Sequence, residues 1–196
     1  MQKKPVTWEL LRKSFAASLL IALGNAALLK LGQPIGPVLF AFGLLGVCVM
    51  GLNLFTGKCG FLFQDHLPPL DLLWMLAGNL AAGYLCGLAL AAADPAMAEA
   101  AAAKVAGWSV SLPFFLQSCL CGVIMYIAVL LYRKGTPLGI LLGVPLFIFC
   151  GFQHCIANAI TLGAARTFHG SLPLCVAGNF AGSILAWFLG GERAKA

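Results

Sequence analysis

The segment Gly-Phe-Gln-His-Cys-Ile-Ala-Asn at residues 151–158 places a glycine, two amides and a histidine in the middle of an apolar stretch. That stretch, near residues 137–162, is longer than a single membrane crossing needs. A second stretch, near 36–60, carries Gly-Leu-Asn-Leu-Phe-Thr-Gly at 51–57. Irregular backbone is tolerated inside a membrane only where protein or a water-filled cavity satisfies its polar groups. We therefore expect two broken helices that face a cavity, with half-helix ends that favour an anion.

The composition assigns most of the chain to a lipid bilayer. Of 196 residues, 61% are hydrophobic and only 9% are charged, so a soluble domain of this size could not cover its apolar surface. This excludes disorder, nucleic-acid binding and a soluble enzyme fold. The net charge of +6 resides mostly at chain ends and in loops, which is typical of a membrane topology signal.

Six apolar segments are long enough to be spanning helices. An even number places both termini on one side, and nine of the twelve Lys and Arg residues fall on that side, so we expect cytoplasmic termini in a bacterial inner membrane. Residues 1–13 are interpreted as an N-terminal lead-in helix, 14–190 as one transmembrane domain and 191–196 as a cytoplasmic tail. The six segments lie near 14–31, 36–60, 70–93, 110–132, 137–162 and 172–190.

The two halves resemble each other at a constant offset of one hundred residues. Ala-Gly-Asn occurs at 77–79 and again at 177–179, and Pro37 and Gly51 match Pro137 and Gly151. Each half, about 14–93 and 110–190, carries three spans, so the second half starts on the opposite side of the membrane. Inverted three-helix repeats are typical of channels and transporters, whose sites lie at the midplane.

His154 is the strongest candidate for a functional residue, because an ionisable group inside a span is costly. Burial favours the neutral imidazole, whereas a bound anion favours the charged form. Such a ring can attract an anion and offer it a proton, so that a weak acid crosses in neutral form. A histidine that only bonds a neighbouring helix is the structural alternative.

Other residues have structural interpretations beside functional ones. Phe40 and Leu44 are one helical turn apart, and Phe147 precedes His154 by seven residues, so all three could narrow a pore or simply pack. Asn79 and Asn179 are expected to bond backbone groups freed at the breaks. Glycine stripes in the third and sixth spans predict close helix packing. The eight cysteines are interpreted as packing residues without disulfides.

These motifs resemble those of the formate/nitrite transporter family. Residues 151–158 are similar to its G-F-E-H-S/C-x-A-N signature on a broken fifth helix, and Leu-Phe-Thr-Gly at 54–57 is similar to its motif on a broken second helix. The Gly-Asn pairs at 78–79 and 178–179 resemble its motifs on helices three and six. The chain departs from the family pattern at Gln153, where the signature has Glu, and at Gly122, the expected polar pore position on the fourth helix.

The resemblance implies an aquaporin-like homopentamer with one pore in each protomer. It implies transport of small monovalent anions such as formate, nitrite, hydrosulfide or short carboxylates, often with a proton. The sequence has no Cys/His cluster at metal-ligand spacing, and neither a cofactor nor a metal is expected. His154 would be the central pore residue, with Thr56 as its partner. The other residues expected along the path are Leu54, Phe55, Phe40, Leu44, Phe147, Asn158, Gln153 and, as a vestibule lysine, Lys104.

Two other functions fit parts of the sequence. Gln153, Gly122 and the apolar residues are compatible with a pore for water or a small neutral solute. His154 with Cys155 and Cys150 is compatible with a membrane thiol-redox protein, although no carboxylate that could act as a base lies mid-span. A channel or proton-coupled transporter for small anions, rather than an enzyme, accounts for most of the motifs.

Overall fold

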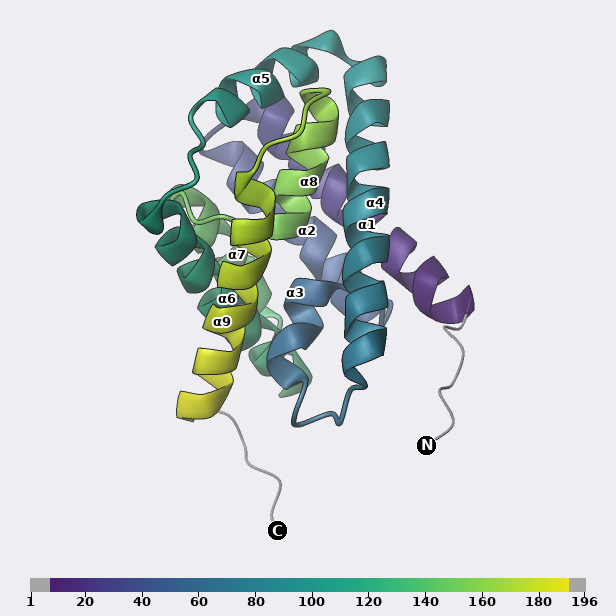
Figure 1. Ribbon diagram of the computed structural model, residues 1–196, viewed down its shortest axis with the longest axis vertical. Coiled ribbons are helices and arrows are strands. Elements are labelled where there is room, and N and C mark those ends of the chain that lie inside the picture. Colours follow the sequence, from purple (N-terminus) through teal and green to yellow (C-terminus); the bar gives the residue numbers. More distant parts are fainter. Residues whose placement is uncertain (1–7, 191–196) are drawn as a thin grey trace.

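The computed structural model describes residues 8–190, and this range is all-α (Figure 1). Four helices are long and apolar enough to cross a bilayer, namely α1, α4, α6 and α9. Their outward faces carry exposed leucines and phenylalanines, as expected of surfaces that contact lipid or another subunit. The helices are α1 (Trp8–Leu31), α2 (Ile35–Val49), α3 (Phe55–Lys58), α4 (Pro69–Ala93), α5 (Pro95–Ala106), α6 (Leu112–Arg133), α7 (Leu138–Phe149), α8 (Cys155–Ala164) and α9 (Ser171–Gly190), with a 3-10 turn, η1, at Cys59–Phe61.

The two predicted helix breaks are confirmed. The helix α2 ends at Val49 and α3 begins at Phe55, while α7 ends at Phe149 and α8 begins at Cys155. At both ends a glycine adopts a left-handed conformation, with φ of 60° at Gly51 and 72° at Gly151. This conformation closes a helix end at no steric cost only for glycine. The half-helices α3 and α8 run from the centre toward opposite ends of the molecule, as Figure 1 shows.

Each break is held by one buried asparagine, as the sequence predicted. The Asn79 side chain accepts a hydrogen bond from the backbone N–H of Phe55 at 2.8 Å and donates to the carbonyl of Asn53 at 3.0 Å. In the same way, the Asn179 side chain accepts a hydrogen bond from the backbone N–H of Cys155 at 2.8 Å and donates to the carbonyl of Gln153 at 2.7 Å. Both amides also donate to a carbonyl of a neighbouring long helix, on α1 in one half and on α6 in the other. Backbone groups that lack a helical partner are thereby satisfied in both halves.

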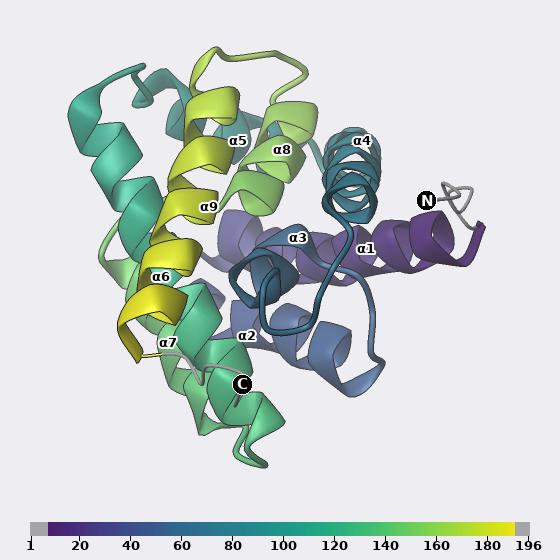
Figure 2. The same ribbon diagram turned by 60° about the horizontal axis from the view of Figure 1, so that its bottom comes forward.

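The predicted glycine stripes allow helices to approach closely. A Cβ on Gly87 of α4 would lie 2.0 Å from the carbonyl oxygen of Ile160 on α8, and one on Gly182 of α9 would lie 1.8 Å from that of Cys119 on α6. Figure 2 brings the end opposite α5 forward, and α3 lies there among the surrounding helices. These glycines thus allow close packing of α4 on α8 and of α9 on α6.

Two elements differ from the division of the chain into spans and connections. The predicted lead-in helix is not separate within the described residues, because α1 is continuous from Trp8; residues 1–7 and 191–196 lie outside the described range. The segment 94–107, which lies between the third and fourth expected spans, forms a further helix, α5, with Asp94 as its N-cap through a bond from Ala96 N–H. The ion pair with Lys30 lowers the pKa of Asp94. The contact therefore persists above the ordinary pKa of Asp94 and is lost as the pH falls through the lowered one.

Replacing Asn79 by alanine should destabilise the fold strongly. The substitution leaves the N–H of Phe55 and the carbonyl of Asn53 without partners in a dry interior, so we expect a loss of about 3 kcal/mol or more. Asn179→Ala should behave alike. Asn25→Ala is the matched control, because Asn25 makes a single 3.3 Å bond to Thr161 and its removal should cost less. Thermal unfolding in detergent measures the three variants, and an Asn79→Ala protein no less stable than Asn25→Ala would contradict the assignment.

Candidate functional site

His154 lies at the centre of the described structure, at the last position of the break before α8. Its side chain is 2% exposed. Nδ1 accepts a hydrogen bond from the backbone N–H of Ala157 at 3.2 Å, so the imidazole acts as the N-cap of α8. Nε2 lies 2.8 Å from Oγ1 of Thr56, which belongs to α3 of the other half. One side chain therefore links the two half-helices.

These bonds assign the protonation state of the ring. Because Nδ1 accepts a hydrogen bond, the neutral imidazole carries its hydrogen on Nε2 and donates it to Thr56 Oγ1. The Thr56 hydroxyl keeps its own hydrogen for another acceptor. Protonation of Nδ1 would break the cap of α8 and place a positive charge at the positive end of that helix. The geometry thus favours a neutral His154 that donates to Thr56 over a charged imidazolium.

Bulky apolar side chains flank the pair. The ring of Phe147 stacks on His154 with centroids 5.8 Å apart, and Phe40 meets Phe147 edge to face at 6.1 Å. Leu44, one turn after Phe40, and Leu54 lie on the other side, and each of these four side chains is at most 3% exposed. Phe40 and Leu44 are about 6 Å apart along the helix axis. These four side chains are called the apolar barrier, and its two residues on α2 are one helical turn apart.

Two cavities approach this barrier from opposite ends. The α5 cavity, of about 380 Å³, lies beneath α5 and is lined by Phe40, Phe147, His154, Lys104, Gln153 and Asn158, among others. The α3 cavity, of about 230 Å³, is lined by Leu44, Leu54, Lys58, Tyr132 and Arg133, among others. The helix α2 passes from the first cavity at Phe40 to the second at Leu44. The histidine–threonine pair lies between them.

Cations and no carboxylates line both cavities within residues 8–190. The α5 cavity contains Lys104, and the α3 cavity contains Lys58 and Arg133. Arg133 is already neutralised, because its guanidinium pairs with both carboxylate oxygens of Asp65 at 2.7–2.8 Å. Lys104 is exposed at the wall of its cavity. Partial desolvation of its ammonium group by the surrounding protein lowers its pKa. An anion in either cavity would meet positive charge before reaching the barrier.

Gln153 uses both ends of its amide. Nε2 donates to the carbonyl of Gly151 at 2.8 Å, and Oε1 accepts from Nδ2 of Asn158 at 3.1 Å. A glutamate could accept from Asn158 but could not donate to Gly151. The amide therefore suits this backbone and leaves Lys104 as the charged residue of the α5 cavity within the described range.

The structure brings together most of the sequence-predicted site residues. Phe40, Phe147, His154, Gln153, Asn158 and Lys104 share one cavity, Leu44 and Leu54 share the other, and Thr56 contacts His154. Phe55 is buried but lines neither cavity. Lys58 lines the α3 cavity and was not singled out by the sequence, although its position one hundred residues before Asn158 was a usable signal.

Gly122 is not a pore position. A Cβ there would lie 2.2 Å from the carbonyl oxygen of Asn179 on α9. The residue therefore faces a helix contact, where no side chain fits. The α6 residues that do face the α3 cavity are Val129, Tyr132 and Arg133.

The profile of the formate/nitrite transporter family matches residues 2–191 of the sequence. The chain belongs to the formate/nitrite transporter family. It is accordingly a membrane protein of a family of transporters and channels, as the motifs at 54–57 and 151–158 indicated. Among curated proteins, no sequence matches the chain.

Solved structures of this family share the fold. An "FNT family ion channel" superimposes with a TM-score of 0.74 and 19% identity, covering 92% of this chain and 87% of that one. A "pentameric formate channel with formate bound" has a TM-score of 0.72 and 17% identity, covering 93% and 94%. At these identities the likeness establishes the all-helical channel fold.

Placing a methyl group at position 122 tests the packing of α6 on α9. Gly122→Ala should destabilise the protein by about 2–3 kcal/mol, because backbone atoms on both helices would have to move. Gly57→Ala is the matched control, since its Cβ would lie at an ordinary 3.5 Å from Val129. Thermal unfolding in detergent compares the two, and equal stability would show that α6 and α9 pack differently.

Proposed function

We propose that the chain is a channel or proton-coupled transporter for small monovalent anions of weak acids, with His154 and Thr56 at the centre of its path. The observation that carries this proposal is the buried His154–Thr56 bond between two cavities that hold unneutralised lysines. Lys104 attracts an anion into the α5 cavity, and the apolar barrier then opposes transfer of the anion's charge.

The solute crosses the barrier as the neutral, protonated acid. Burial among Phe40, Phe147, Leu44 and Leu54 disfavours the charged form, so a proton from cavity water accompanies the anion. His154 Nε2–H and the Thr56 hydroxyl supply hydrogen bonds that replace lost water. Formate, nitrite, hydrosulfide and short carboxylates fit this chemistry, and the pentameric relative has formate bound.

In the bilayer, we infer six crossings in two inverted repeats, an aquaporin-like arrangement. Four crossings are made by α1, α4, α6 and α9, and two by the pairs α2–α3 and α7–α8. The opposite directions of α3 and α8 support the inversion. The inversion is also supported by the similar backbone dihedral angles of two residues that are one hundred positions apart. They are φ −108° and ψ 123° at Leu54 and φ −109° and ψ 116° at His154.

The assembly we propose is a homopentamer with a pore in each protomer. The pentameric relative and the exposed apolar faces of the long helices support it. The charge distribution supports cytoplasmic termini in a bacterial inner membrane, because Lys58 and Arg133 lie at the end opposite α5. The transmembrane domain then comprises residues 14–190, with the remaining residues on the cytoplasmic side.

Uptake into proteoliposomes tests this function. Labelled formate and nitrite should enter faster at acidic than at neutral external pH, because an inward proton gradient drives the neutral acid. A proton ionophore should abolish the difference. Water or urea permeation without any anion uptake would instead favour a neutral-solute pore and would refute the proposal.

His154→Leu should reduce formate uptake at least about tenfold, since it removes a hydrogen-bond donor from the barrier and leaves the anion's lost hydration uncompensated. Leucine is the residue that the other half carries at the equivalent position 54. Thr56→Val should also slow uptake. His169→Leu is the control, because His169 lines neither cavity and bonds Ser171. If His154→Leu took up formate as fast as the control, the histidine would not lie on the transport path.

Gln153→Glu should lower anion uptake several-fold at neutral pH. A carboxylate would place negative charge in the cavity of Lys104 and lose the hydrogen bond to the Gly151 carbonyl. Uptake should recover as the external pH falls and the new carboxylate is protonated. A variant with wild-type uptake at neutral pH would show that the charge of this cavity does not influence flux.

A further inference from the structure

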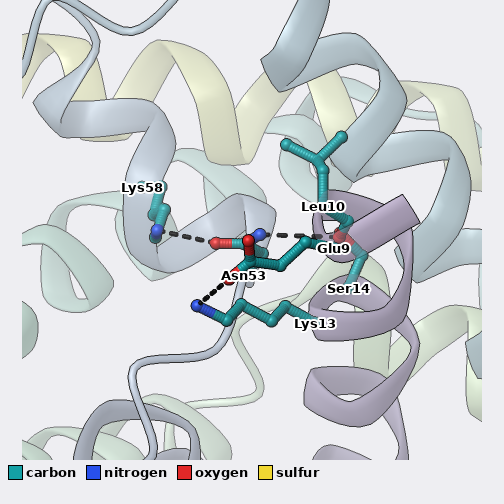
Figure 3. Close-up of polar contacts among 6 residues, drawn as sticks. All are labelled: Glu9, Leu10, Lys13, Ser14, Asn53 and Lys58. Carbon is teal, nitrogen blue, oxygen red and sulfur yellow. Dashed lines mark hydrogen bonds and ion pairs between the residues drawn. The ribbon is translucent and has the colours of Figure 1, made fainter. Parts of the chain in front are cut away.

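Lys58 projects from the half-helix α3 at the α3 cavity and is held there by an amide. Its Nζ donates to Oδ1 of Asn53 at 2.7 Å, while Nδ2 of Asn53 donates to the carbonyl of Leu10 at 3.5 Å. Figure 3 shows Lys58 and the Leu10 carbonyl on opposite sides of the Asn53 amide. The ammonium is therefore positioned by neutral groups, and one of its three hydrogens is used.

The neighbouring cations are neutralised by carboxylates, whereas Lys58 is not. Lys13 pairs with Glu9 at 2.9 Å, as Figure 3 shows, and Arg133 pairs with Asp65. Within residues 8–190, Lys58 forms no ion pair. Asp65 acts on Lys58 electrostatically, but both of its carboxylate oxygens are bonded to Arg133, so Lys58 supplies the positive charge of the α3 cavity that no carboxylate contacts.

The other half repeats this arrangement with a neutral residue. One hundred residues later, Asn158 of α8 donates to the side chain of Gln153 at 3.1 Å, as Lys58 donates to that of Asn53. Each donor lines the cavity on its own side of the barrier. The equivalent contact shows that the backbone orients this position toward a cavity in both halves, and that the chain places a charge there in one half only.

We propose that Lys58 forms a second anion-binding site, which takes up a small carboxylate or similar oxyanion in the α3 cavity before it reaches His154. The inference rests on the transport function proposed above. The ammonium keeps its bond to Asn53 and turns its remaining hydrogens to the anion. Lys104 serves the opposite cavity from α5, so each face of the protein has its own docking lysine.

Face-specific kinetics test this site. Initial uptake of labelled formate is measured against its concentration in right-side-out and in inverted membrane vesicles. Lys58→Asn copies the residue of the equivalent position. It should raise the half-saturating formate concentration about fivefold from the α3 face alone, which corresponds to ~1 kcal/mol. Lys104→Asn should raise it from the α5 face alone.

Two further variants and a salt series distinguish the effect of the charge of Lys58 from that of its hydrogen bond to Asn53. Lys58→Arg should restore the half-saturating concentration, whereas Lys58→Gln, which keeps a donor for Asn53, should not. In the wild type, added salt should weaken uptake from the α3 face, and Lys58→Asn should lose this dependence. Unchanged kinetics in Lys58→Asn, or equal changes at both faces, would overturn the site. Absence of formate uptake by the wild type would instead overturn the proposed function itself.

Discussion

A helix that is interrupted inside a membrane must find partners for the backbone groups that the break releases, because lipid supplies none. Asn79 and Asn179 meet this requirement by bonding both sides of their breaks. With the two breaks satisfied, the ends of α3 and α8 can meet at the centre. The contact between Thr56 and His154 and the cavities on either side of it depend on that meeting.

Positions one hundred residues apart at the two breaks have similar backbone geometry but different chemistry. Leu54 and His154 occupy equivalent positions with nearly the same dihedral angles, yet one is apolar and the other donates a hydrogen bond. Lys58 and Asn158 differ in the same way, by a charge. Similar backbone at these positions thus carries different side-chain chemistry on the two sides of the His154–Thr56 contact.

Much of the fold and part of the site could be predicted from patterns in the chain. The breaks, the role of the two asparagines and the family followed from residue types that have few other uses in an apolar segment. The position of Gly122 was predicted wrongly, because spacing does not tell which side of α6 faces α9. The helix α5 was missed because its alanine-rich stretch resembles a loop between polar ends.

By itself, the sequence determined that the chain is a helical membrane protein with two broken helices, motifs that recur at an offset of one hundred residues and a histidine within an apolar segment. These features follow from local composition and periodicity, which can be recognised in a segment without knowing what packs against it. Only the tertiary structure decided that His154 is a neutral donor to Thr56, that Gln153 bonds Gly151 and that Lys58 lines a cavity. Those properties depend on distances between side chains and backbone in the folded chain, which no local pattern contains.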